Sequence, residues 1–136
     1  MVEPVAELLE KSISYVGSNS VTRVQVGLQN FHPQQFRFDL IWIQWCSGHL
    51  TDSDMCGLTE NGVIVFKDNL SSQQESEFDC EDNSWTRPEP LVRSLFERAG
   101  LRVVAENLQT GFPAGMYKVK MFALKPERRS AEKESS

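Results

Sequence analysis

Two nearly uninterrupted apolar runs constrain the fold of this chain more than any other feature of its sequence. Phe38 to Trp45 reads FDLIWIQW, and Gly62 to Lys67 reads GVIVFK. Such runs are typical of central strands in a parallel sheet, because both faces of that sheet are covered and neither face alternates with polar residues. We therefore expect a sheet in which Phe38–Ile43 and Gly62–Lys67 run parallel.

The segments around these runs have the patterns of helices and further strands, which favours an α/β fold. Apolar residues recur at helical spacing over Val5–Val16 and Glu89–Ala99. Shorter strands are expected at Thr22–Val26, Leu101–Glu106 and Tyr117–Leu124, with the last antiparallel at the edge of the sheet. Residues 68–84 are polar and acidic without a period, which predicts a long loop, and the charged tail from Pro126 predicts disorder.

Composition narrows the classes of function. The chain has 136 residues, enough for one core, and a net charge of −5 that argues against a nucleic-acid-binding surface. No apolar run is long enough to cross a bilayer, and no signal peptide is evident. Cys46, Cys56 and Cys80 form no C-x-x-C pair, so they predict free thiols in a reducing compartment and no metal site. We expect a nuclear and cytoplasmic protein without nucleic-acid, membrane or metal partners.

The sequence turns polar where the first apolar run ends. Gln44, Trp45 and His49 follow Ile43 within one short segment. In open α/β sheets, ligands bind beyond the carboxyl ends of the strands, so these side chains are expected to line a crevice. The residues after Lys67 lie at the equivalent end of the next strand.

Taken one at a time, the same residues have plainer interpretations. His49 is compatible with a loop or helix start, and Trp42 with the core. An asparagine after a strand, here Asn69, is ordinary turn chemistry. The remaining candidates would be solvated: Glu3 as part of a disordered terminus, and Asp79, Glu81 and Asp82 as an acidic loop.

Several blocks, taken in order, resemble one family. They read VEPVAELLEKSISYVG, GLQNF, FDLIWIQWCSGHLTD, ENGVIVFKDN, DCEDNSWTR, AGLRVVAE and FALKP. The order and wording resemble the alpha-N-terminal protein methyltransferases, which use S-adenosylmethionine to methylate the α-amine of proteins beginning Xaa-Pro-Lys. The resemblance implies a class I, Rossmann-like, mostly parallel sheet. It also implies that residues 1–125 are the C-terminal part of a methyltransferase domain and that 126–136 are a disordered tail.

The resemblance assigns roles to the cofactor half of the site. Glu3 resembles the acid that binds the ribose hydroxyls, followed by Pro4 and Val5 against the cofactor. Leu28 and Gln29 resemble the pair that flanks the adenine. Gln44 resembles the glutamine near the methionine end of S-adenosylmethionine.

It also assigns roles to the acceptor half. Trp45 resembles the indole that packs on the substrate peptide, and Asn69 and Asp79 resemble the residues that hold its amino terminus. His49 and Asp82 resemble the residues that accept the amine proton. An α-amine has a pKa near 8 and is largely protonated at neutral pH, so a nearby base must remove its proton before it can attack a methyl group.

The sequence also departs from this family. It contains no G-x-G, it begins at the family's second strand without the first strand and the glycine-rich turn, and its connection over 52–61 is short. The chain thus resembles a truncated product, which we expect to bind S-adenosylmethionine weakly or not at all by itself. Three functions stay open: an N-terminal protein methyltransferase, an inactive fragment that binds protein, and a methyltransferase of a small amine.

Overall fold

A computed structural model describes residues 1–16, 21–32, 38–52 and 63–127. The chain divides into two compact units, Met1–Phe36 and Arg37–Ser136, which are treated separately. The first unit contains α1 (Ala6–Val16) and the 3-10 turn η1 (Leu28–Asn30). The second contains β1 (Leu40–Gln44), η2 (Ser47–His49), β2 (Val63–Ser71), β3 (Glu77–Asp79), β4 (Ser84–Pro88), α3 (Glu89–Arg98), β5 (Leu101–Leu108) and β6 (Lys118–Pro126).

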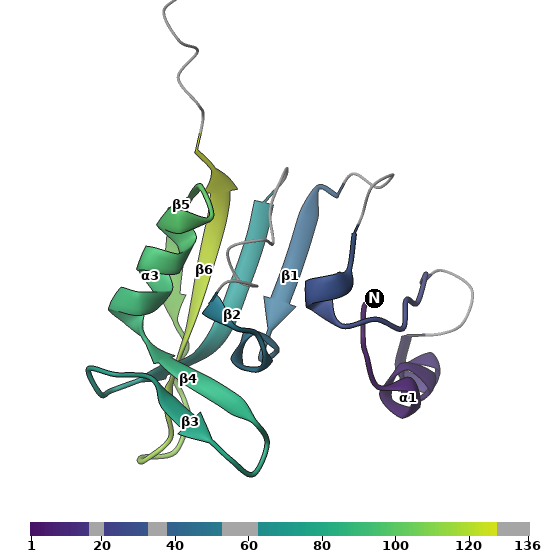
Figure 1. The fold of residues 1–136 in the computed structure, drawn as a ribbon, viewed down its shortest axis with the longest axis horizontal. Coiled ribbons are helices and arrows are strands. Elements are labelled where there is room, and N and C mark those ends of the chain that lie inside the picture. Colours follow the sequence, from purple (N-terminus) through teal and green to yellow (C-terminus); the bar gives the residue numbers. More distant parts are fainter. Residues whose placement is uncertain (17–20, 33–37, 53–62, 128–136) are drawn as a thin grey trace, which may run out of the picture. The chain divides into compact units, whose positions relative to one another are not determined.

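The two apolar runs pair as expected. β1 and β2 are parallel, from Leu40 opposite Val63 to Gln44 opposite Lys67. β4 also runs parallel to β2 and joins it further along, with Leu70 opposite Arg87. Because β6 occupies the other side of β2, β1 and β4 follow one another along the same edge. At the carboxyl end of β1, the chain turns away from β2. Beyond this point β4, the second strand of the β3–β4 hairpin, pairs with the same edge of β2 (Figure 1).

The sheet is mixed in the residues that the structure describes. β6 is antiparallel to β2, as expected, but the expectation that it forms the edge is wrong, because it lies between β2 and β5. The burial of β6 fits this position, because Val119 is buried on one face of the sheet and Phe122 and Leu124 on the other, whereas β5 is largely exposed beyond Val103. β5 is thus the outer strand.

The long loop expected over residues 68–84 is also wrong. β2 continues to Ser71, and β3 and β4 form an antiparallel hairpin with Asp79 opposite Ser84. Its polar sequence concealed these strands, because the hairpin is stabilised at the surface rather than in the core. The half-exposed rings of Phe78 and Trp85 pack across it at 4.7 Å, and Ser71 Oγ donates a hydrogen bond to Glu77.

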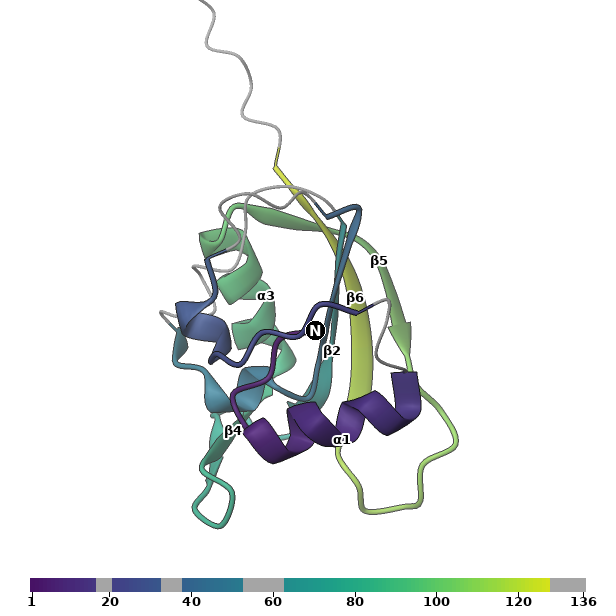
Figure 2. The ribbon, with the colours of Figure 1, turned by 90° about the vertical axis from the view of Figure 1, so that its right-hand side faces the viewer.

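α3 covers one face of the sheet and forms the core with it. Figure 2 views the sheet nearly edge-on and shows α3 on one side of β2 and β6. Phe96 of α3 packs edge-on against Phe66 at 5.1 Å and Phe122 at 5.4 Å. Ile43 lies beside Phe66 and shares its buried face, so Trp42 points to the opposite face and is 55% exposed. The core position considered for Trp42 is therefore wrong.

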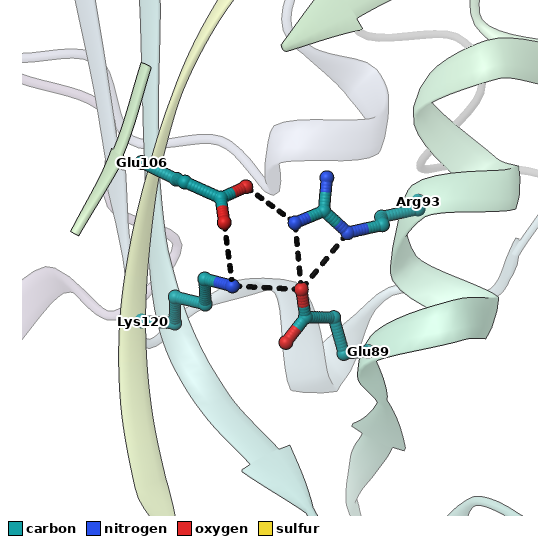
Figure 3. Close-up of polar contacts among 4 residues, drawn as sticks. All are labelled: Glu89, Arg93, Glu106 and Lys120. Carbon is teal, nitrogen blue, oxygen red and sulfur yellow. Dashed lines mark hydrogen bonds and ion pairs between the residues drawn. The ribbon is translucent and has the colours of Figure 1, made fainter. Parts of the chain in front are cut away.

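Four charged residues join α3 to β5 and β6 (Figure 3). Arg93 and Lys120 each contact both Glu89 and Glu106, with Lys120 Nζ 2.7 Å from Glu89 Oε1 and 3.0 Å from Glu106 Oε1. The hydrogen bond from Lys120 lowers the pKa of Glu89, and that from Arg93 lowers the pKa of Glu106. We call these four residues the charge network.

The first unit is built on a helix and one bridge. α1 spans nearly the whole helix expected at Val5–Val16. The strand expected at Thr22–Val26 is reduced to a single parallel bridge, in which Val24 pairs with Val2. Arg23 Nε donates to Ser12 Oγ at 2.7 Å, which ties α1 to this bridge.

At the other end of the chain, Pro126 was expected to begin the disordered tail, but it is the last residue of β6 and pairs with Leu101. Residues 128–136 lie outside the described residues, as does nearly all of the short connection 52–61. The two domain boundaries predicted from the sequence stay predictions.

Candidate functional site

The candidate site begins where the chain turns away from β2 after Gln44. Trp45 has φ 51°, a left-handed conformation that an L-residue with a large side chain rarely adopts. Its N–H donates to Lys67 O at 3.1 Å, and Lys67 Nζ lies 4.9 Å from the ring centroid. The indole is 49% exposed, so its flat surface is available. Gln44 accepts a hydrogen bond from Trp42 Nε1 at 3.0 Å, which leaves the amide NH₂ of its side chain for another partner.

His49 lies at the end of η2, directly beyond this turn. Its side chain is exposed, whereas Ser47 and Leu50 on either side are buried. Gly48 lies so close to β4 that a Cβ there would be 3.2 Å from both Ser84 Cβ and Trp85 O. The backbone that carries His49 is thus packed against the hairpin, while the imidazole faces outward.

The hairpin brings acids to the neighbourhood of His49. Asp79 pairs with Ser84, so the two side chains share one face of the hairpin, and Ser84 is the residue that meets Gly48. Asp79 accepts a hydrogen bond from the N–H of Glu81 at 2.8 Å. Asp82 is exposed in the turn between the strands. The structure forms no hydrogen bond or ion pair between His49 and Asp82, both of which it describes.

Asn69 does not lie in a turn, because it sits inside β2 opposite Val119. It alternates with Asp68 and shares the sheet face of Lys67, the residue beneath Trp45. The structure therefore places Asn69 on the same sheet face as Lys67, beside Trp45.

Sequence reasoning missed a buried polar cluster beneath His49. Arg87 of β4 is 4% exposed and donates to Ser47 O, Leu50 O and Asp52. Ser47 Oγ donates to the carboxylate of Asp68, whose pKa is raised by burial. Asp68 follows Phe66 on the covered face of β2, and this alternation was the signal that could have identified it as partly buried.

The cofactor residues of the first unit come from two parallel segments. Because Val2 and Val24 form a parallel bridge, Glu3 and the η1 residues Leu28 and Gln29 both follow the same end of it. Glu3 Oε1 accepts the N–H of Val5 at 2.9 Å. Pro4 and Val5 are exposed at the start of α1. A carboxylate beside a polar turn at the end of parallel strands fits the ribose and base of a nucleoside.

Two further searches concern only the described part of the chain. No three His, Cys, Asp or Glu side chains there gather as metal ligands. None of its helices is long and apolar enough to span a membrane.

Comparisons with known proteins identify the fold and the family. Residues 1–125 match the model of a family described as AdoMet-dependent proline di-methyltransferase. Over 93% of its length the chain is 44% identical to alpha N-terminal protein methyltransferase 1 of Caenorhabditis elegans, of which it covers 58%. It is 42% identical over 92% of its length to N-terminal Xaa-Pro-Lys N-methyltransferase 1-B of Xenopus laevis, covering 60% of that protein.

Solved structures agree. A SAM-dependent methyltransferase of Leishmania major superposes with a TM-score of 0.81 and 34% identity, over 91% of this chain and 53% of that one. An N1-methyltransferase of Burkholderia thailandensis with bound S-adenosylhomocysteine has a TM-score of 0.70 at 16% identity over 93% of this chain and 60% of that one, which shows the fold alone.

The similarity to solved methyltransferases shows that the mixed sheet is an incomplete class I methyltransferase fold. More particularly, the chain belongs to the family of AdoMet-dependent proline di-methyltransferases, which includes the alpha N-terminal protein methyltransferases. The chain spans about 60% of the length of the curated relatives it matches.

Proposed function

We propose that this chain carries the acceptor half, and part of the cofactor half, of an enzyme that methylates the α-amine of protein amino termini beginning Xaa-Pro-Lys. The observation that carries the proposal is the packing of the His49 segment against the hairpin of Asp79 and Asp82 at the carboxyl end of β1. Family membership supports the same reaction, and the relative from Xenopus laevis is named for it.

The exposed side chains suit a cationic peptide. Asp79, Glu81 and Asp82 place three carboxylates on one exposed hairpin, which would attract both the amino terminus and the lysine of an Xaa-Pro-Lys substrate. Trp45 offers a half-exposed indole on which a proline ring can pack. Asn69, on the same sheet face, has amide groups that can position the incoming terminus.

His49 and Asp82 are the groups proposed to take the amine proton. The amine must lose its proton to become nucleophilic, and histidine titrates in the range where that transfer is effective. Asp82 is exposed on the neighbouring turn and can accept the same proton or stabilise the resulting imidazolium. Neither role needs a metal ion.

The residues of the chain fit the cofactor of this family. S-adenosylmethionine supplies an electrophilic methyl group when it is bound. Glu3 would hold the ribose hydroxyls, Leu28 and Gln29 would flank the adenine with Pro4 and Val5 beside them, and Gln44 would face the methionine end with the amide group that Trp42 leaves available.

The test is the position of the methyl group on a peptide. The 136-residue chain and a chimera, in which residues 1–125 replace the matching segment of the Caenorhabditis elegans relative, are incubated with a Ser-Pro-Lys peptide and S-adenosylmethionine. Mass spectrometry should locate methyl groups on the α-amine, and an N-acetylated peptide should stay unmodified. A folded chimera that methylates only the lysine side chain, or a small amine but not the peptide, contradicts the proposal.

The same assay separates the enzyme from an inactive protein-binding fragment. Turnover by the 136-residue chain alone assigns the activity to it. Peptide binding without turnover by that chain, together with turnover by the chimera, favours the fragment.

The proposed cellular setting follows from the thiols and the net charge of the chain. Cys80 is a free thiol, which is typical of a reducing compartment, and the acidic chain gives no reason to expect nucleic-acid binding. We propose a location in the nucleus and cytoplasm, without nucleic-acid or membrane partners. A tagged chain that fractionates with membranes or chromatin would contradict this.

A further inference from the structure

The side chain of Arg87 is a buried cation with an unusual set of partners. It is 5% exposed, and its only ion-pair partner in the described part of the chain is the half-exposed Asp52, 2.8 Å from Nε. Its other two hydrogen bonds go to backbone carbonyls, from Nη1 to Ser47 O at 3.1 Å and from Nη2 to Leu50 O at 2.5 Å. Burying a charge is costly unless it is well satisfied, so this arrangement has a specific use rather than a general stabilising one.

The three acceptors of Arg87 bracket His49. Ser47 begins η2, Leu50 follows its end, and Asp52 lies two residues further on. A single 3-10 turn is weak alone, and this one is closed by a hydrogen bond from Leu50 N to Ser47 O at 3.0 Å. A planar guanidinium can span three acceptors in fixed directions, which no other side chain can do.

A second anchor acts on the same segment from β2. Ser47 Oγ donates to the carboxylate of the half-buried Asp68, which also accepts the N–H of Asn69 at 2.8 Å. The backbone on either side of His49 is thus fixed by β2 and β4 together, while His49 itself is exposed. Sites that must present one side chain accurately are supported by residues of this kind.

We infer that Arg87 is a positioning residue for methyl transfer: it holds the Ser47–Asp52 segment so that His49 faces the acids of the β3–β4 hairpin. The inference rests on the proposed function for its catalytic meaning, and on the contacts of Arg87 for its structural meaning. The buried guanidinium is thus retained because it holds His49 in position.

Arg87→Lys tests the inference, with Arg93→Lys as the matched control. Both variants keep the positive charge and lose the guanidinium. Arg93, however, pairs with Glu89 and Glu106 in the charge network, whereas Arg87 contacts the η2 segment. In the 136-residue chain, hydrogen exchange at the amide of Leu50 should be at least about tenfold faster in Arg87→Lys, while amides of β6 stay unchanged. In the chimera, kcat should fall by about tenfold to a hundredfold while KM for S-adenosylmethionine changes by less than about threefold. Arg93→Lys should change neither readout.

Each possible result supports or overturns the role inferred for Arg87. Unchanged exchange at Leu50, or faster exchange with undiminished kcat, overturns the inference and leaves the proposed function standing. A folded chimera without substitutions that has no methyltransferase activity overturns both. Should Arg87→Lys fail to fold, Asp52→Asn decides instead, because its amide oxygen can still accept a hydrogen bond from Arg87 while the ion pair is lost. It should lower kcat by about threefold to tenfold, and an unchanged kcat would overturn the inference.

Discussion

The second unit contains two clusters of charged residues with different structural roles. In the charge network, two cations and two carboxylates neutralise one another near the surface between α3, β5 and β6. Around Arg87, one buried cation has a single carboxylate contact, and its other acceptors are backbone carbonyls of the segment that bears His49. Charge pairs near the surface join secondary-structure elements, whereas a buried cation whose other acceptors are backbone carbonyls fixes the backbone beside the candidate site.

The sharpest contrast is expected in turnover. His49→Ala or Asp82→Ala in the chimera should lower kcat by on the order of a hundredfold, with a much smaller change in peptide affinity, if each takes part in proton transfer. Arg93→Gln should leave kcat within about twofold, because the ion pairs of Arg93 go to Glu89 and Glu106 and, among the described residues, to none in η2. Steady-state kinetics on a Ser-Pro-Lys peptide make the comparison, and equal effects at the two clusters would remove the distinction between them.

Trp45 gives a second contrast, between binding and backbone strain. Trp45→Ala and Trp45→Gly both remove the indole, so both should weaken peptide binding by about tenfold. Glycine tolerates the φ of 51° that Trp45 adopts, so Trp45→Gly should be more stable than Trp45→Ala by about 1 kcal/mol. Peptide titration and urea unfolding measure the two effects. Equal stability of the variants would show that the positive φ carries no strain.

A smaller effect is expected when the charge network is broken. Arg93→Gln should lower the free energy of unfolding by about 1 kcal/mol or less, because Arg93 and its partners are partly solvated. Added salt should reduce the difference from the unsubstituted chain. Urea unfolding at low and high salt measures it, and a larger loss that salt does not affect would contradict this view of the network.

The smallest effects distinguish the two clusters by the sign of their pH dependence. The lowered pKa of Glu89 contributes stability that is present above its ordinary value and is lost as the pH falls through the lowered one. Burial raises the pKa of Asp68, so its ionised form costs stability at neutral pH, and the cost disappears as the pH falls through the raised value.

These signs predict opposite trends for two matched amide substitutions. The stability of Glu89→Gln relative to the unsubstituted chain should improve on acidification, whereas that of Asp68→Asn should decline. Unfolding at about pH 7 and about pH 4 tests both trends, and parallel trends would contradict the assignment of opposite environments.

The sequence predicted elements whose patterns are set by the core. The parallel pairing of β1 with β2 and the helix α3 followed from apolar runs and helical spacing. The β3–β4 hairpin did not, because its strands are held by Phe78 packing on Trp85 and by backbone pairing at the surface, which leave no apolar period. The position of β5 outside β6 depends on long-range pairing that no local pattern encodes.

The sequence indicated the exposed residues of the candidate site but not the residues that hold them in place. Trp45 and His49 were identified because polar and aromatic side chains at the end of a strand break the pattern, and a family resemblance gave them roles. Arg87 and Asp68 look like ordinary surface charges in the sequence, since burial of a charged residue is decided by contacts that arrive from elsewhere in the chain.

The most direct test of the account is methylation of a Ser-Pro-Lys peptide by the chimera in which His49 and Asp82 are both replaced by alanine. Single-turnover rates would be compared with those of each single variant and of the unsubstituted chimera. If the two side chains share one proton-transfer task, the double variant should be about as slow as the slower single variant, on the order of a hundredfold below the unsubstituted rate. A double variant that methylates the α-amine at the unsubstituted rate would contradict the account and leave the segment around His49 with a structural role alone.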